Sequence, residues 1–306
     1  MLFKFVERKA WYFALSGVLI LPGLFFLLAG GLKLGVEFRG GTLLDARFDP
    51  PPAVAEVKDL FVTLGHSEAI VQAAEGGRVQ VRTVEMQAEE LGTVQRAIAA
   101  KYGGRFKDLS SSVVSASFSA ELIQNAIGAI TVASILIVFL IAFAFRSFGW
   151  SAFRYGIAAI IALLHDALVV LGLFAFLGYF FNVEVDSLFV TAVLTIIGFS
   201  VHDTIVVFDR IRENLRLNPG EALNAVINFS IMQTLARSVI TSLTVVLTLL
   251  ALYLFGGYSM RTFALALLVG IVSGTYSSIF NASQIVSLWQ ELEDRARHRR
   301  VESARA

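Results

Sequence analysis

Two histidine–aspartate pairs lie inside long apolar stretches of the chain. His202 and Asp203 are in IGFSVHDTIVVFDRIRENL (residues 197–215), and His165 and Asp166 are in ALLHDALVVLGL (residues 162–173). A charged side chain at the centre of a membrane helix costs about 2.5–3.5 kcal/mol on the mildest insertion scale. We therefore expect these carboxylates to serve a function that needs a charge or a proton inside the protein.

The segment that carries Asp203 has two different faces if it is helical. Four polar residues share one side: Thr191, Thr195, His202 and Asp203. Apolar residues recur every three or four positions on the other side and form one stripe: Val190, Leu194, Ile197, Val201, Ile205 and Phe208. Because polar groups inside a membrane protein usually face its interior, we predict that the polar side faces the helix bundle and that the stripe meets lipid or packs dryly.

The next apolar segment carries a second polar stripe. Arg237 is followed at helical spacing by Thr241, Thr244 and Thr248. If the two segments are antiparallel, Asp203 and Arg237 lie at similar depth, and an ion pair is geometrically possible. Burial favours the neutral form of a carboxylic acid and a nearby guanidinium favours the charged form, so a carboxylate that meets Arg237 in only one conformation would bind and release a proton.

Simpler roles are open for these residues. Arg237 could extend to the lipid headgroups and fix the topology of its helix. The threonines could be packing residues whose hydroxyls bond back to their own helix. In the last apolar segment, Gly270, Gly274 and Ser278 form a small-residue seam typical of close helix contact, with Asn281 on about the same side.

The chemistry of a metal or cofactor is not indicated. Metal binding needs three or four converging ligands, which the two His–Asp pairs could supply only in principle, and the chain has no H-E-x-x-H or comparable helix motif. It also has no cysteine, which excludes disulfides and thiolate ligands. We expect neither a metal nor another cofactor, and no catalytic residue.

These residues must be positioned by membrane-spanning helices. The chain has 306 residues, of which 56% are hydrophobic, and its 25 basic and 24 acidic residues give no overall charge that would favour nucleic acid. A helix needs about 20 apolar residues to cross a bilayer. Six segments reach that length: Ala10–Leu32, Leu122–Phe145, Tyr155–Phe181, Leu188–Phe208, Leu235–Phe255 and Phe263–Trp289.

Basic residues predict how these helices are oriented. Arg and Lys are concentrated before the first segment, around Arg146 and Arg154, around Arg212, and in the tail that follows the last segment. The positive-inside rule therefore places both termini in the cytoplasm, with Arg261 as the exception. We expect residues 1–32 to form the amino terminus and first helix, residues 120–290 to form helices two to six, and residues 291–306 to form a basic cytoplasmic tail.

Residues 33–119 form a polar insert that this topology places outside the cytoplasm. Alternating and helical patterns follow one another in the order βαββαβ, with Gly-Gly between the second and third strands. That order is the ferredoxin-like split motif, in which two helices cover one face of an antiparallel sheet. The free face could meet a partner, or the insert could be purely structural.

Several long motifs resemble the SecF subunits of the SecD/SecF family, within the RND superfamily. They are GVEFRGGTLLDARF (residues 35–48), ALLHDALVVLGL, VEVDSLFVTAVLTIIGFSVHDTIVVFDRIREN (residues 183–214), TLARSVITSLT (residues 234–244) and LYLFGG (residues 252–257). Glu37 and His202 depart from the family pattern, which has Asp and Asn there.

The resemblance implies a multi-pass protein of the bacterial inner membrane that forms half of a unit with SecD. The pair would act beside the SecYEG channel, in membrane lipid, and use the proton-motive force to draw preproteins outward. By position, Asp203 is implied as the proton acceptor and Arg237 as its partner. Asp166 and His165 are further candidates, and His202 could change the titration of Asp203.

Two other functions are open on sequence grounds. A stand-alone RND-type exporter of lipids or small molecules would share the helices, but it should contain two homologous six-helix halves, and the chain shows no internal repeat. An intramembrane aspartyl protease would also need two aspartates, yet the YD and GxGD signatures are absent. We therefore expect a transport protein and not an enzyme.

Overall fold

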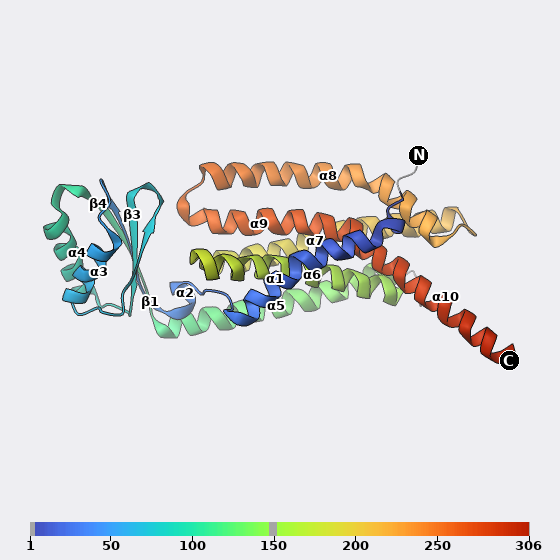
Figure 1. Cartoon of the computed structure of the whole chain (residues 1–306), viewed down its shortest axis with the longest axis horizontal. Coiled ribbons are helices and arrows are strands. Elements are labelled where there is room, and N and C mark those ends of the chain that lie inside the picture. Colours follow the sequence, from blue (N-terminus) through green and yellow to red (C-terminus); the bar gives the residue numbers. More distant parts are fainter. Residues whose placement is uncertain (1–3, 147–151, 306) are drawn as a thin grey trace. The chain divides into compact units, whose positions relative to one another are not determined.

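The computed structural model describes residues 4–146 and 152–305 (Figure 1). The chain divides into two compact units. The helical unit comprises Met1–Lys33 and Ala129–Ala306, and the sheet unit comprises Leu34–Gly128.

Among the described residues, six helices are long and apolar enough to cross a membrane, as the sequence predicts. They are α1 (Lys9–Ala29), α5 (Ala116–Phe145), α6 (Ala152–Phe181), α7 (Ser187–Leu217), α8 (Leu223–Phe255) and α9 (Tyr258–Tyr276) with its continuation. α9 passes through a π-helical turn (Ser277–Ala282) into α10 (Ser283–Arg305). Residues 147–151, in the predicted basic loop before α6, lie outside the described residues.

The helices extend further than the apolar segments predict. α7 continues past Phe208 to Leu217, and α8 begins at Leu223, well before Leu235. Buried residues beyond the apolar segments, such as Ile211 and Ile227, explain this, because they continue the packed face of each helix. The side chain of Asp186 caps the start of α7 by accepting a hydrogen bond from the backbone N–H of Phe189 at 2.9 Å.

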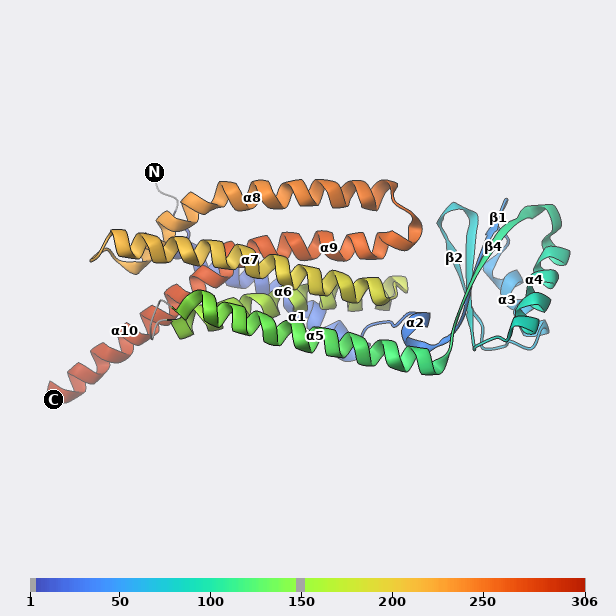
Figure 2. The ribbon, with the colours of Figure 1, turned by 180° about the vertical axis from the view of Figure 1, so that it is seen from behind.

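The centre of the helical unit is formed by α6, α7 and the α9–α10 span. In the most apolar stretch of each of these three spans, about half of the residues are buried: 44%, 50% and 56%. The corresponding shares in α5, α1 and α8 are only 6%, 11% and 17%. Figure 2 shows α8 and α5 along the edges of the bundle. α1 approaches α6 at a glycine pair, where a Cβ on Gly23 would lie 2.7 Å from the Cα of Gly172. Only glycine allows backbones to come so close.

Ion pairs hold the start of α10 against α1 and α6. Lys9 pairs with Glu291, and Arg154 pairs with Glu293 at 2.8 Å. The predicted basic tail is therefore a helix whose first acidic residues are bound to other helices. The side chains of Arg297, His298 and Arg300 lie outside the described set.

The sheet unit has the element order that the sequence predicts. After a short helix α2 (Val36–Arg39), its elements are β1 (Gly41–Phe48), α3 (Val54–Thr63), β2 (Ile70–Ala74), β3 (Arg78–Thr83), α4 (Ala88–Tyr102) and β4 (Phe106–Val114). The strands are ordered β2-β3-β1-β4, and every neighbouring pair is antiparallel. Both helices lie on one face of the sheet (Figure 1), where Leu44, Phe61 and Ile98 form the core.

A glycine pair begins the sheet. Gly40 and Gly41 have φ values of 76° and 117°, in the region that favours glycine. A Cβ on Gly41 would lie 2.4 Å from the carbonyl oxygen of Thr83 on β3. The backbone of β1 can therefore pair closely with β3 only because position 41 has no side chain.

Candidate functional site

Asp203 lies on α7 with 4% of its surface exposed. Its Oδ2 atom is buried and has no hydrogen-bond partner. In the described part of the chain, no ion pair or hydrogen bond joins Asp203 to Arg237. The pair that the sequence suggests is therefore not in contact in this structure.

The other polar residues that the sequence singles out on α7 and α8 are exposed, and we term them together the polar lane. Its members are Thr191, Thr195 and His202 on α7, and Arg237, Thr241, Thr244 and Thr248 on α8. The two helices are packed neighbours (Figure 2). All seven residues are exposed, although they lie within segments that can span a membrane.

The predicted orientation of α7 was therefore wrong for Thr191, Thr195 and His202. Of the four polar residues expected to face the bundle, only Asp203 is buried. The apolar stripe packs inside the protein, the second of the two predicted alternatives: Ile197, Val201 and Phe208 are buried and Val190, Leu194 and Ile205 are half-buried. Helical periodicity separates two faces but does not say which one the same chain covers.

The four residues of the predicted stripe lie on one helix, α8, and all are exposed. Its threonines donate hydrogen bonds to their own helix: Thr241 to the Arg237 carbonyl at 2.9 Å, Thr244 to Thr241 at 2.7 Å and Thr248 to Thr244 at 3.0 Å. Thr191 and Thr195 do the same on α7. These hydroxyls have satisfied donors, as expected for packing residues, and only their acceptor lone pairs face outward.

The small-residue seam of α9 is confirmed as a helix contact. A Cβ on Gly270 would lie 2.2 Å from Cδ1 of Ile196, and one on Gly274 would lie 3.1 Å from Cβ of Ser200. Ser278 donates to the carbonyl of Ser200 at 3.0 Å and accepts from Thr204 at 2.8 Å. The seam therefore joins α9 and the π-helical turn to α7.

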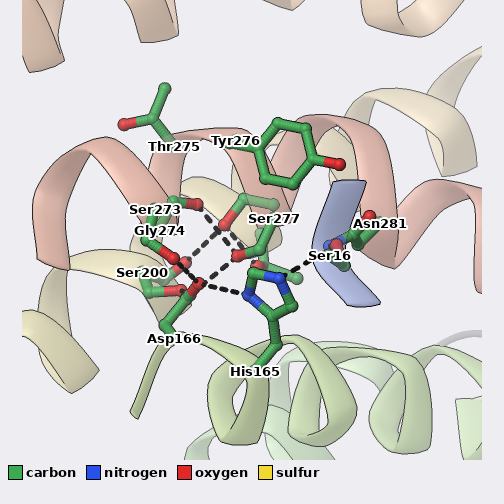
Figure 3. A network of polar contacts seen from close by, with 12 residues as sticks. Ser16, His165, Asp166, Ser200, Ser273, Gly274, Thr275, Tyr276, Ser277 and Asn281 are labelled. Atoms are coloured by element: carbon green, nitrogen blue, oxygen red, sulfur yellow. Dashed lines mark hydrogen bonds and ion pairs between the residues drawn. The ribbon is translucent and has the colours of Figure 1, made fainter. Parts of the chain in front are cut away.

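Asp166 is the centre of a second polar site, buried among α6, α7 and α9 (Figure 3). Ser200 and Ser277 donate to its Oδ2 at 2.5 and 2.7 Å. Ser273 donates to Oδ1 at 2.9 Å, and Nδ1 of His165 lies 3.0 Å from the same oxygen. A carboxylate offers about four lone-pair sites, so these four partners fill its acceptor capacity.

The contacts continue from His165 to α1 and the π-helical turn. Nε2 of His165 lies 3.0 Å from the hydroxyl oxygen of Ser16, which accepts a hydrogen bond from Nδ2 of Asn281 at 2.8 Å. The sequence predicted that His165, Asp166 and Asn281 lie inside the span. It did not identify Ser16 or the three serines that bind Asp166, although Ser273 and Ser277 are spaced by one helical turn.

The site residues thus belong to two groups. Asp203 and Arg237 lie at the polar lane, where a conformational change could bring them into contact. His165 and Asp166 lie in the serine-lined interior. Each group thus has a buried carboxylate at its centre.

Comparison with known proteins decides the family. The family model described as "Protein export membrane protein SecD/SecF, C-terminal" matches residues 94–292, and that of the "SecD/SecF GG Motif" matches residues 25–52, which include Gly40 and Gly41. The chain belongs to the SecD/SecF family. Protein translocase subunit SecF of Thermobaculum terrenum is 45% identical over 309 residues, with 97% of each chain covered. SecF of Anaerolinea thermophila is 39% identical, with 94% of each covered.

Some members of the SecD/SecF family are longer. SecDF of Bacillus subtilis is 34% identical over 295 residues, which cover 94% of this chain and 38% of SecDF. The crystal structure of SecDF from Thermus thermophilus, described as a translocon-associated membrane protein, superimposes with a TM-score of 0.84 at 33% identity. The match covers 95% of this chain and 39% of that one. The predicted resemblance to SecF is therefore confirmed, and the relatives are translocase subunits, in keeping with transport and not enzymatic activity.

Proposed function

We propose that the chain is a subunit of the Sec translocase that, together with SecD, couples proton flow to outward movement of preproteins delivered by the SecYEG channel. Asp203 binds the transported proton, and Arg237 is its conformation-dependent partner. The observation that carries this proposal is the polar lane, which is exposed in the chain but lies at membrane depth.

The polar lane supports a protein partner at this face. A guanidinium and six further polar side chains are poorly solvated by lipid tails, so the face is stable when polar groups or water cover it. The SecDF relatives provide a source for that cover, because the region matching this chain is only 39% of the T. thermophilus SecDF chain. We infer that a SecD subunit packs against α7 and α8.

Proton coupling is supported by the state of Asp203. The carboxylate is buried with an unpaired oxygen, and burial disfavours its charged form unless a donor or a cation approaches. Movement of α8 that brings Arg237 into contact would favour release of the proton, and its withdrawal would favour uptake. Each proton that crosses about 100 mV releases about 2.3 kcal/mol, enough to bias a two-state motion.

The proposed arrangement in the inner membrane follows from the distribution of basic residues. Both termini and the α7–α8 connection, which has Arg212 and Arg216 before it, lie on the cytoplasmic side. The sheet unit, a ferredoxin-like domain by its βαββαβ order, then lies on the outer side, where it can contact an emerging preprotein. The SecF names of the relatives favour this function over a stand-alone exporter of lipids or small molecules.

Asp203→Asn tests the proposal directly, because the amide cannot bind and release a proton. Inverted vesicles that contain the variant with SecD should lose the export that depends on the proton-motive force and keep the early, ATP-driven step. Asp209→Asn, which changes an exposed acid on the same helix, is the matched control and should export normally. Full proton-dependent export by the Asp203 variant would refute the assignment.

A further inference from the structure

The site around Asp166 is organised to hold a carboxylate whose donors are all fixed. Three serine hydroxyls and the imidazole of His165 point at its two oxygens, two at each (Figure 3). Asp166 is 1% exposed, and within the described residues its hydrogen-bond partners are His165 and three serines, none of them in the polar lane. The cluster is therefore a second buried polar site, separate from Asp203.

The partners of His165 determine its tautomer. An ionised carboxylate can only accept, so Nδ1 carries the hydrogen that bonds to Asp166. The Ser16 oxygen accepts from Nδ2 of Asn281, which leaves its own hydrogen to donate to Nε2 of His165. Donors therefore point in one direction along Asn281, Ser16, His165 and Asp166.

We propose that Ser16, His165 and Asp166 form a second proton-binding site, in which Ser16 and His165 relay a proton to the carboxylate. The Nδ1 proton moves to Oδ1 of Asp166 while Nε2 takes the hydroxyl proton of Ser16. A hydronium ion that reaches Ser16 replaces that proton. The sum is one proton gained by Asp166 and one lost by hydronium, and His165 stays neutral but changes from the Nδ1–H to the Nε2–H tautomer.

The surroundings accommodate both protonation states. After transfer, Oδ1–H of Asp166 donates to Nδ1, and Nε2–H donates to the Ser16 oxygen. The new Ser16 hydrogen needs an acceptor, and Oδ1 of Asn281 is buried without a partner. Asn281 is 3% exposed. Rotation of its amide would place this oxygen where Nδ2 now meets Ser16, so in the protonated state Oδ1 gains a partner and Nδ2 gives up its bond to Ser16.

The end of the relay at Ser16 faces a groove in the helical unit. The groove has a volume of about 540 Å³, and its walls are apolar except at Ser16, His165 and Asn281. Ser16 is therefore the end of the cluster nearest this groove, between α1 and α10, whereas Asp166 is enclosed.

Few other ionisable groups face this site. On α6 there is His165, and on α9 the ring of Tyr276 lies 6.1 Å from that of His165. The Tyr276 hydroxyl donates to the carbonyl of Tyr12 on α1 at 2.7 Å and also hydrogen-bonds with the side chain of Ser16. α7 contributes Ser200, and its nearest charged residue is Asp203, one turn further on. The proton of Asp166 therefore passes through His165.

The role of this second site in transport rests on the proposed function. The relay itself can be tested by spectroscopy, without an export assay. The chain is expressed with SecD, labelled with ¹⁵N at histidine, and placed in lipid nanodiscs in the Asp203→Asn background. The ¹⁵N signals of His165, assigned by comparison with His165→Gln, should change from the Nδ1–H to the Nε2–H tautomer as the pH is lowered. An infrared band of a protonated carboxyl group should appear with the same midpoint and be absent after Asp166→Asn.

Matched variants separate the relay from general packing. Ser16→Ala should abolish the tautomer change, whereas Ser278→Ala should preserve it, because Ser278 is equally enclosed but bonds only to α7. A His165 that keeps one tautomer throughout, or that becomes an imidazolium, overturns the proposal. If Asp166→Asn does not fold, the NMR signals of His165 still test the relay. The export activity of Asp203→Asn tests the proposed function only and does not decide whether the relay exists.

Discussion

Arg237 is the residue whose role is most open to a direct test. Its side chain is exposed at the polar lane, and no ion pair or hydrogen bond joins it to Asp203 in the described part of the chain. A guanidinium binds a carboxylate with two parallel N–H groups, whereas an ammonium is a point charge on a flexible stem. Arg237→Lys should therefore insert normally but lose most proton-dependent export, measured in vesicles with SecD present. Equal export by the Lys variant would assign Arg237 to membrane topology instead.

The sequence identified the site residues better than their surroundings. The carboxylates and Arg237 stand out because charged groups are costly in a membrane span. The serines around Asp166 do not, because Ser16 and His165 are 149 residues apart and single hydroxyls are common in membrane helices. His202 and the α7 threonines were assigned to the wrong side since the sequence of one chain contains no information on what a partner covers.

At the scale of elements, the contact between α7 and α9 depends on the missing side chain at Gly270. The Cβ of an alanine there would overlap three atoms of Ile196, which is 1% exposed and cannot move into free space. Overpacking of this kind costs about 1–3 kcal/mol. Gly270→Ala should lower the thermal unfolding temperature of the purified protein in detergent.

Two further variants show whether the clash with Ile196 causes the lower unfolding temperature of Gly270→Ala. Ile196→Ala removes the overlapping atoms, so it should restore part of the stability lost in Gly270→Ala. Gly198→Ala also replaces a helical glycine, but nothing lies within 4 Å of the added Cβ, and it should unfold at or above the normal temperature. An unchanged unfolding temperature in Gly270→Ala would mean that α9 can move away from α7 at little cost.

The elements themselves were largely predictable. Six apolar blocks gave six helices, and the alternating and helical patterns of residues 33–119 gave the strand and helix order of the sheet unit. The ends of α7 and α8 were not, because α7 continues into charged sequence and α8 begins in a stretch interrupted by polar residues such as Asn224, Asn228 and Gln233, where hydropathy no longer indicates a helix. The π-helical turn at Ser277–Ala282 was also missed, since it arises from packing against α6 and α7 and has no local sequence signal.

At the scale of the whole molecule, the helical unit is asymmetric in its burial. α6, α7 and α9 are enclosed, whereas α8 exposes a polar face next to apolar residues such as Leu243 and Leu247. Lipid can cover the leucines, but the polar lane needs a polar surface. We predict that the SecD subunit of the same organism purifies with this chain in equal amount and that replacing Thr241, Thr244 and Thr248 together by leucine reduces its recovery several-fold.

The control distinguishes the partner surface from the lipid surface of the same helix. Replacing the exposed Leu243, Leu247 and Leu250 by alanine alters a comparable number of side chains on α8 while keeping the polar lane intact, so SecD recovery should stay normal. Both variants should be monodisperse in detergent, because neither set belongs to the buried core. If the threonine variant retains SecD fully while the leucine variant loses it, the partner packs against the apolar face of α8, and the polar lane must be covered by water or by another subunit.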